Sequence, residues 1–543
     1  LLSLNLSKHS RLRNSASVDF PNFFQVRYLY FPPVCQNINN NKNTRQMEVN
    51  NMFSLSKIKQ LNLFEQISEL NHLSAKQPIG FLNLLSDNFD LESFIPESFS
   101  SHYYSTLGRD REYKLTSILS SLILMQIFHI PTNILLHLFL IFSSEIREFC
   151  GFYNSVPDES YFSRFKIEFE KDIADLFNSL VPNVIDICDE FNNLLPNNSP
   201  YKDRNSMLIY DTSGLKPKVK ENNPKTLVSE INKQKSYAKA TNKKNHNAYA
   251  AAYKNMPKFA AANPNIKLDF VNGHFGYFYK FGMLTNGLGI PLSINFFDED
   301  FYSSVKQEFE TPEEQKYAYD NASLKSVVEL FLTNLKSKSN FKFDVFLGDS
   351  EFDSYENFGL LKQLDFSKVF IPLNSRNQKN TKINDLEFNT NGIPLCPITK
   401  DEFKAEGPCG GKNRSLRHKF TCPKSHRDKK GKCYHTCETP CTDKKSGRMT
   451  YVYPDKDFRL YPGVLRNSTE WDRTYKIRSI IERELSCFKF NPCIQSPNTV
   501  NTTTMRSDLY LTAISKLINV ILAHSLNNPT YIRSIRKLLV ISA

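Results

Sequence analysis

Four side chains able to bind phosphate or metal recur at helical spacing beside the only tryptophan, in the segment EWDRTYKIRSIIERELSCFKF. They are the phenol of Tyr475, the guanidinium of Arg478, the carboxylate of Glu482 and the ammonium of Lys489. At about 100° per residue, the four positions fall on one helical stripe roughly 60° wide. The alternative is a solvated helix face that carries an Arg478–Glu482 pair at i,i+4.

Two aspartates follow apolar segments that are typical of strands: Asp211 after MLIY and Asp349 after FDVFLG. Carboxylates at the carboxyl ends of neighbouring strands meet at the sheet edge where α/β proteins bind ligands. With Glu482 they would form an all-oxygen site suited to two Mg²⁺ or Mn²⁺ ions. Two such ions activate an attacking oxygen and stabilise a leaving oxygen in phosphoryl transfer. The alternative for each aspartate is a turn or helix cap, which fits Asp353 better than Asp349.

The elements that must position these residues alternate between strands and helices from about residue 206 onward. Strands are predicted for MLIYDTS (207–213), Gly276–Leu284, Pro291–Phe297, Phe343–Gly348 and Lys368–Pro372. Helices are predicted at Ala322–Leu335, at Tyr355–Leu364 with Asp353 or Ser354 as its N-cap, at 475–490 and at 506–527. This alternation predicts an α/β fold class with layered strands and helices.

The residues before this alternation are expected to be helical. A leader at 1–52, rich in Asn, Lys and Arg, is expected to be disordered or a translation artefact. Residues 53–200 carry apolar positions at helical spacing and predict an N-terminal helical domain that binds DNA, with a plain helical bundle as the alternative. The apolar run Leu115–Phe142 is broken at Pro131, which predicts two buried helices instead of a membrane span. A further helix is expected around Tyr161–Leu180.

Two segments interrupt the α/β pattern. The first, about 216–269, is rich in lysine and tyrosine, a mixture that can follow a phosphate backbone and stack on bases; a solvated loop is the alternative. The second, 374–462, holds six of the eleven cysteines. The candidate ligands for a structural Zn²⁺ are Cys422, Cys433, Cys437 and Cys441. The alternative is an insertion with reduced, free cysteines.

The net charge of the chain indicates its class of partner, and the apparent lack of a signal peptide or membrane span indicates its location. The formal net charge of +13 over 543 residues favours a polyanionic partner. With neither a signal peptide nor a membrane span in view, the expected location is the cytoplasm, in association with the nucleoid. The expected organisation is a leader at 1–52, a helical domain at 53–200, a core in two parts at 201–373 and 463–543, and a Cys-rich insertion at 374–462.

The spacing Tyr475-x2-Arg478-x3-Glu482-x6-Lys489 resembles the Y-R-E-K helix of DDE transposases from bacterial insertion sequences. LIYDTSGLK and FLGDSEFDSYEN are similar to the segments that carry the first and second aspartates of that family. GRDREY, FCGFYNSVPDESYFSRF and NGHFGYFYKFGMLTNGLGIPLSINF add further similarity, so that the resemblance covers roughly residues 101 to 526.

This resemblance implies a ribonuclease-H-like mixed-sheet core in which Asp211, Asp349 and Glu482 hold two Mg²⁺ or Mn²⁺ ions. Arg478 and Lys489 would contact DNA phosphates, and Tyr475 would help to position them. The implied activity is hydrolysis of a strand at the transposon end, followed by joining of the 3′-hydroxyl to target DNA. The implied partners are double-stranded terminal inverted repeats, target DNA and a second copy of the chain. The alternatives are an inactive or domesticated DNA-binding protein of the same fold and a structure-specific metal-dependent nuclease.

Overall fold

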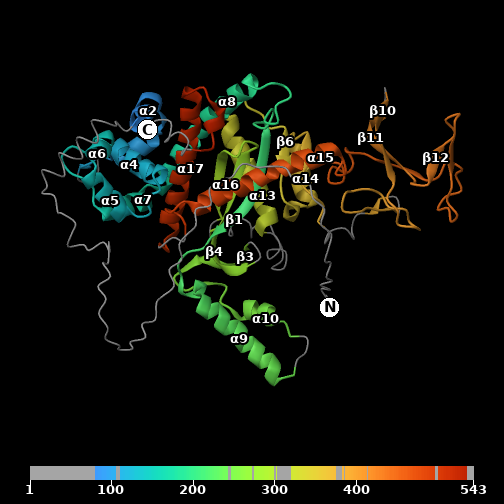
Figure 1. Cartoon of the computed structure of the whole chain (residues 1–543), viewed down its shortest axis with the longest axis horizontal. Helices are drawn as coiled ribbons and strands as arrows, with labels where there is room; N and C mark the ends of the chain where they lie inside the picture. The colour runs from blue at the N-terminus through green and yellow to red at the C-terminus, as the bar shows by residue number, and fades with distance from the viewer. Residues whose placement is uncertain are drawn as a thin grey trace, which may run out of the picture. The chain divides into compact units, whose positions relative to one another are not determined.

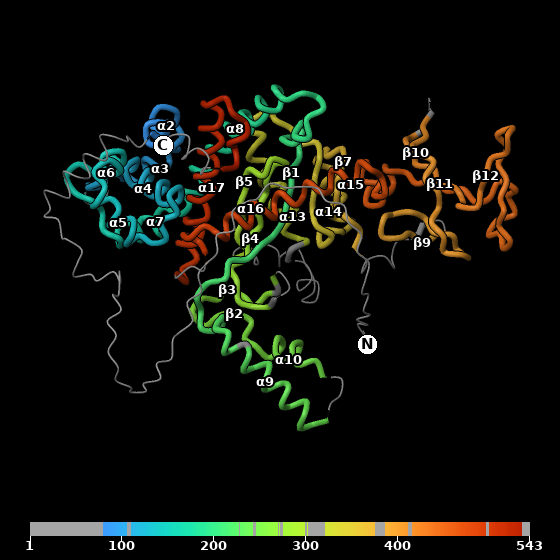
Figure 2. Tube along the Cα trace, viewed as in Figure 1, coloured from blue at the N-terminus to red at the C-terminus, as the bar shows by residue number. Residues whose placement is uncertain are grey.

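The computed structural model describes residues 80–105, 110–242, 246–271, 274–298, 301, 319–374, 382–383, 386–411, 414–495 and 499–534 (Figures 1 and 2). All of them belong to the larger of the two units into which the chain divides, Asn71–Ala543. The expected leader and the apolar positions between residues 53 and 79 lie outside the described residues.

The described residues before the first strand are helical. Their elements are α2 (Gly80–Asn88), η2 (Glu92–Phe94), α3 (Glu97–Tyr103), α4 (Leu115–Ile127), α5 (Asn133–Phe142), α6 (Ser144–Phe149), α7 (Glu159–Glu168) and α8 (Glu170–Leu194). The expected pair of helices around Pro131 is present as α4 and α5, but only α4 is buried as predicted. Most apolar side chains of α5 are exposed, and only Leu136 and Leu140 of this helix are buried. None of the described helices combines the length and apolar character that a bilayer span requires.

A late helix, α17 (Thr502–Ser525), completes this helical layer by packing against α4, α7 and α8; the short η7 (Pro529–Tyr531) follows it. Lys166 of α7 and Asp508 of α17 form a buried ion pair of 2.6 Å. Asn491 and Thr512 both donate hydrogen bonds to Oε1 of Gln126 in α4. Because buried polar groups are costly unless they are paired, these contacts fix the register between the first helices and the last.

A mixed sheet follows the first helices. Its strands are β1 (Met207–Leu215), β2 (Phe259–Ala260), β3 (Asn263–Val271), β4 (His274–Asn286), β5 (Pro291–Phe296), β6 (Val345–Leu347) and β7 (Lys368–Phe370). The order is β2-β3-β4-β1-β6-β7, with β5 also paired to β4. β1, β6 and β7 are parallel neighbours, whereas β4 runs antiparallel to β1. The expected mixed α/β class is therefore confirmed.

The strand β1 continues beyond the residue at which the sequence predicted its functional end. Asp211 lies in the middle of β1, opposite Met283 of β4, and the pairing continues to Leu215 opposite Tyr279. The parallel partner β6 pairs only with Met207–Ile209 of β1. The prediction that Asp211 lies at the carboxyl end of a strand is therefore wrong with respect to β4, with which β1 stays paired beyond Asp211. With respect to β6, Asp211 does lie past the last paired residue of β1.

The Lys-rich segment forms regular structure instead of a loop. It contains η3 (Lys220–Asn222), α9 (Pro224–Ala240) and α10 (Ala248–Asn255), and its end supplies β2 and β3 to the main sheet. The first half of β4 pairs with β3, whereas its second half pairs with both β1 and β5. Sequence reasoning missed β3 because its apolar residues are interleaved with Lys267 and Asp269.

Helices α13 (Tyr319–Lys336) and α14 (Tyr355–Gln363) lie on either side of β6 in the chain. Later in the chain follow α15 (Thr469–Tyr475), η6 (Lys476–Arg478) and α16 (Ser479–Phe490). Helix α16 packs against β1, and both elements appear at the centre of Figure 1. Gly289, at φ +82°, lies after β4 where an added Cβ would come within 2.6 Å of Cγ2 of Ile480, so this turn closely abuts the start of α16.

The Cys-rich segment has a small apolar core of its own, which includes Leu386, Phe403, Phe420 and Tyr461. Its strands are β8 (Lys382–Ile383), β9 (Leu386–Glu387), β10 (Lys404–Gly411), β11 (Arg414–Thr421), β12 (Ser425–Arg427), β13 (Cys433–His435) and β14 (Met449–Val452). They form one three-stranded sheet, β10-β11-β14, and two hairpins.

Candidate active site

Three carboxylates from separate parts of the sequence meet at one guanidinium. Nη1 of Arg478 lies 3.3 Å from Oδ2 of Asp211 and 3.7 Å from Oδ2 of Asp349. Nη2 of Arg478 donates a 2.5 Å hydrogen bond to Oε1 of Glu482. The i,i+4 pair that formed the alternative reading is therefore present, but it is one part of a four-residue cluster.

The cluster borders a cavity of about 510 Å³. Asp211, Asp349, Glu482 and Lys489 all line it, so four of the six residues singled out from the Y-R-E-K and aspartate patterns share one space. Sequence reasoning missed other lining residues, namely Thr212, Ser213, Val271, Lys280, Glu351, Leu485 and Ser486. The signal for Glu351 was its position two residues after Asp349. Lys280 had no such signal, because only the strand pairing brings it to the cavity.

Asp211 is the most buried of the three carboxylates, with a side chain 17% exposed. Burial raises the pKa of Asp211 to about 6, and the charges of Asp349 and Glu482 add to this rise. Arg478 and a 2.8 Å hydrogen bond from the backbone N–H of Thr212 act in the opposite direction. The site therefore holds more negative charge at Asp211 than its surroundings fully compensate, which favours a further cation.

Asp349 joins the carboxylate cluster as expected but also caps a helix, whereas Asp353, the better candidate for a cap, forms a buried ion pair instead. Asp349 is the N-cap of η4 (Ser350–Phe352), and its Oδ1 accepts a 2.5 Å hydrogen bond from the backbone N–H of Ser350. Asp353 is buried and receives two 2.7 Å hydrogen bonds from Arg459. Ser354 is the N-cap of α14. Asp349 still presents Oδ2 to Arg478, because capping occupies its other oxygen.

The helix predicted at 475–490 is interrupted. A 3₁₀ turn, η6, separates α15 from α16, so Tyr475 and Arg478 lie before the helix that carries Glu482 and Lys489. The Tyr475 ring stacks on Trp471 at 5.9 Å and lies 5.8 Å from Cζ of Arg478. Because the 3₁₀ turn is wound more tightly than an α-helix, the ideal stripe does not apply across the junction.

Burial shifts the pKa values of Arg478, Lys489 and Tyr475. Burial lowers the pKa of Arg478, but Tyr475 and the three carboxylates outweigh it, so the net shift is upward. Burial also lowers the pKa of Lys489, and the charge of Asp211 only partly opposes this. Burial raises the pKa of Tyr475 to about 12, which keeps its phenol protonated at neutral pH. Arg478 thus remains a fixed positive charge among the carboxylates.

The donor chemistry of the carboxylates suits magnesium, but their present arrangement is held by Arg478. Within the described ranges, no group of three or more His, Cys, Asp or Glu side chains is placed so that it could hold a metal ion as it stands. Carboxylate oxygens are the donors that Mg²⁺ and Mn²⁺ prefer. The raised pKa of Asp211 is the change that a nearby cation would reverse. The three carboxylates therefore have the donor atoms that such ions require, provided that the Arg478 guanidinium moves away from them.

The four candidate zinc ligands are not brought together as a group. Cys422 is buried beyond the end of β11, Cys433 begins β13, and Sγ of Cys437 donates to the carbonyl oxygen of Thr439. Cys441 is hydrogen-bonded to a residue outside the predicted set, Cys396. Burial raises the pKa of Cys441, and Cys396 and Cys422 add to that rise, so these three thiols lie in one electrostatic neighbourhood.

Comparison with known proteins identifies one segment. Residues 62–168 match the family model of a transposase domain (DUF772). No curated protein and no solved structure matches the chain. Among the described residues, the matched segment includes α2 to α7, whereas Asp211, Asp349 and Glu482 all follow it. The match supports a transposase family, and with it DNA cleavage and recombination in general, for the chain that carries this carboxylate cluster.

Proposed function

We propose that the chain is a DDE-type DNA transposase that cleaves a strand at the transposon end and joins the freed 3′-hydroxyl to target DNA. The observation that carries the proposal is the meeting of Asp211, Asp349 and Glu482 at Arg478, beside a cavity of about 510 Å³. The transposase-domain match at residues 62–168 supports it independently, because it lies in a different part of the chain. The mixed sheet flanked by helices is compatible with the ribonuclease-H-like core that the resemblance implies.

In this proposal Asp211, Asp349 and Glu482 would hold two Mg²⁺ or Mn²⁺ ions. Such ions supply an activated attacking oxygen and neutralise the leaving oxygen in phosphoryl transfer. The fixed positions of Asp211 on β1 and Glu482 on α16 define the two sides of the site, since these two elements pack directly. Asp349 adds a third side from the turn after β6, where η4 holds its carboxylate by a cap.

Arg478 and Lys489 would act on the DNA backbone. Lys489 lines the cavity, and a partly buried ammonium there can bind a phosphate oxygen. Arg478 is held by the Tyr475 ring and by carboxylates, and its planar donors suit a phosphate once the carboxylates have other cations. DNA ends, target DNA and a second copy of the chain are the proposed partners.

The test is cleavage and joining by the purified full chain. The substrate is a DNA fragment bearing the sequences that flank the gene, mixed with plasmid target and Mg²⁺ or Mn²⁺. We expect cleavage at the fragment ends and 3′-ends covalently joined to the plasmid. Asp211→Asn, Asp349→Asn and Glu482→Gln should each abolish both steps, whereas Glu356→Gln, an exposed carboxylate change on α14, should retain them.

The outcomes separate the alternatives. Cleavage without joining would favour a structure-specific nuclease, and DNA binding without cleavage would favour an inactive or domesticated relative. Full-rate cleavage by Glu482→Gln would remove the assignment of the carboxylate cluster as the active site.

A further inference from the structure

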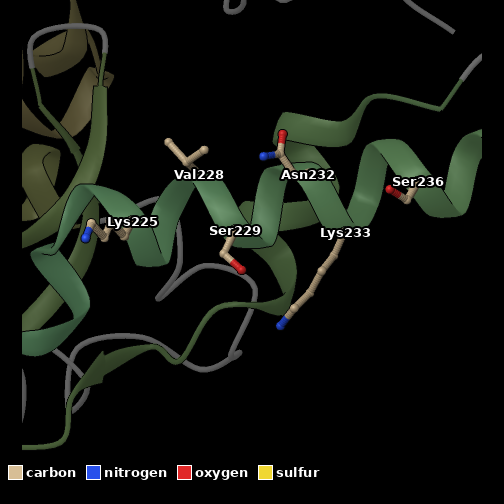
Figure 3. A pocket seen from close by; sticks show the side chains of 6 residues that line it. All are labelled: Lys225, Val228, Ser229, Asn232, Lys233 and Ser236. Carbon is tan, nitrogen blue, oxygen red and sulfur yellow. The ribbon is translucent and has the colours of Figure 1, made fainter.

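One face of α9 carries a basic, small-residue surface that no step of the proposed reaction uses. Six residues line a shallow hollow along it, and Figure 3 shows their side chains: Lys225, Val228, Ser229, Asn232, Lys233 and Ser236. Their spacing of i, i+3, i+4, i+7, i+8 and i+11 places all six within roughly 140° of the helix circumference. We call these six residues, together with Lys239, the α9 face. At the same helical angles, Lys239 falls between Val228 and Asn232.

The opposite side of α9 packs toward α10. The half-buried residues of α9 in its central turns are Glu230, Ile231, Gln234 and Ala238. Glu230 is hydrogen-bonded to Asn255 at the end of α10, and the two helices are in direct contact. Nζ of Lys235 lies 5.9 Å from the centre of the Tyr249 ring of α10. α10 therefore fixes the orientation of α9, and the α9 face is the side left to solvent.

The charge around this face is strongly one-sided. Residues 216–258 contain eleven lysines against two acidic residues, Glu221 and Glu230. Lys225, Lys233 and Lys239 are all exposed. Glu230 forms a 3.4 Å pair with Lys233, whose side chain is 70% exposed. An exposed pair of this kind is weak and can be exchanged for a phosphate at little cost.

Small residues lie between the lysines on this face. Ser229, Asn232 and Ser236 are short, so the helix can approach a flat polyanion closely, and each offers a hydrogen-bond donor for a phosphate oxygen. From Lys225 to Lys239 the helix advances about 21 Å at 1.5 Å per residue. One strand of duplex DNA presents roughly six phosphates over that length.

We infer that the α9 face binds the sugar–phosphate backbone of double-stranded DNA, without reading its sequence. The occupant is set by charge complementarity and by the repeat of donors along a straight helix. The inference rests on the proposed function for its choice of DNA as the polyanion. It adds a second contact region, contributed by the segment that links β1 to β3.

The test measures DNA binding apart from catalysis. A 30-base-pair duplex of arbitrary sequence is titrated with the full-length Asp211→Asn chain, and the dissociation constant is followed against salt concentration. The test variant adds Lys225→Gln, Lys233→Gln and Lys239→Gln. The matched control instead adds Lys336→Gln, Lys338→Gln and Lys342→Gln, three exposed lysines at and after the end of α13. Circular dichroism confirms that both variants fold.

Loss of three phosphate contacts should make the negative slope of log association constant against log salt less steep by about two to three. It should also weaken binding at least tenfold at 0.1 M salt. The α13 control should keep the slope and affinity of the parent chain. A second variant, Ser229→Glu with Ser236→Glu, retains every lysine and should also weaken binding, because it places negative charge on the same face.

Equal affinity and slope for the α9 variant and its parent would overturn the inference. An equal loss in the α13 control would overturn it as well, since any lysines would then serve. If the wild-type chain proves unable to cleave DNA but the α9 variant still loses binding, the proposed function fails and this inference stands. If the wild-type chain cleaves DNA and the α9 variant binds normally, the proposed function stands and this inference fails. A parent chain that binds no duplex at all would overturn both.

Discussion

Nη1 of Arg478 lies 3.3 Å from Oδ2 of Asp211, so the most buried carboxylate of the cluster is neutralised by a side chain of the protein itself. The same guanidinium contacts Asp349 and Glu482. A guanidinium in this position takes the role that a divalent cation has in the proposed reaction. Metal binding and the Arg478 pairing therefore compete for the same oxygens.

This competition predicts that Arg478→Gln binds Mn²⁺ more tightly than the wild type, by about tenfold, equivalent to about 1.4 kcal/mol. The neutral side chain no longer needs to be displaced from the carboxylates. Calorimetric titration of the DNA-free protein with Mn²⁺ measures the change. Arg483→Gln, an exposed change on α16, should bind Mn²⁺ as the wild type does. Unchanged or weaker binding by Arg478→Gln would show that the guanidinium does not compete with the metal.

A second prediction follows from the pKa of Asp211, which burial raises to about 6 from an ordinary value of 3.8. The folded state binds the proton more tightly than the unfolded state, so ionisation of Asp211 lowers stability as pH rises from about 4 to 6. Above pH 6 this loss is complete and amounts to at most about 3 kcal/mol. Asp211→Asn carries no such charge, so without metal it should melt at a higher temperature than the wild type at pH 7.5.

The measurement is the melting temperature of both proteins at pH 4.5 and pH 7.5 in the presence of a chelator. We expect the two curves to approach one another at pH 4.5, where Asp211 is mostly protonated. Added Mn²⁺ should raise the melting temperature of the wild type at pH 7.5 more than that of Asp211→Asn. An advantage of Asp211→Asn that grows toward low pH would have the wrong sign for a buried, charged Asp211.

The sequence was sufficient to predict the elements that have strong local patterns. The apolar runs before Asp211 and Asp349 form β1 and β6, and the break at Pro131 separates α4 from α5. These features depend on side-chain periodicity and backbone geometry within a few residues, which a single sequence displays directly.

Features that depend on distant partners could not be predicted in this way. β1 extends past Asp211 because β4 pairs with it as far as Leu215. Asp353 binds Arg459, 106 residues later in the chain, and Ser354 is the residue that caps α14. The spacing of Tyr475, Arg478 and Glu482 predicted that these residues share one helical stripe, but not that a 3₁₀ turn separates Tyr475 from Glu482.

The pair of Asp353 and Arg459 gives a third prediction. Both side chains are almost fully buried, and they share two hydrogen bonds of 2.7 Å. Asp353→Asn leaves the Arg459 charge uncompensated inside the protein, which typically costs about 3–5 kcal/mol. The midpoint of chemical unfolding should fall clearly, whereas Asp455→Asn, at an exposed position, should leave it unchanged.

The double variant Asp353→Asn with Arg459→Met tests the cause of that loss. It removes the buried positive charge together with its partner, so it should recover part of the stability lost by the single change. A double variant less stable than Asp353→Asn alone would indicate that Arg459 contributes through packing, such as its contact with the Tyr355 ring, more than through the ion pair.

The fourth prediction concerns which cysteines bind zinc in the Cys-rich segment. Burial would raise the pKa of the Cys396 thiol, but hydrogen bonds involving Thr399, Ile398 and Cys441 outweigh it and lower the pKa overall. A thiol stabilised as thiolate is the form that binds zinc. We therefore expect one zinc ion per chain, with Cys396 and Cys441 among its ligands and Cys433 outside the set.

Metal analysis of the purified full chain and its variants separates this set from the one expected from spacing alone. Cys396→Ser and Cys441→Ser should lose the zinc, whereas Cys433→Ser should retain it. The alternative set of Cys422, Cys433, Cys437 and Cys441 requires the opposite result for Cys396 and Cys433. Because a structural zinc stabilises the segment that it folds, each variant that loses zinc should also become more sensitive to proteolysis within 374–462. A wild-type chain without zinc would contradict both ligand sets.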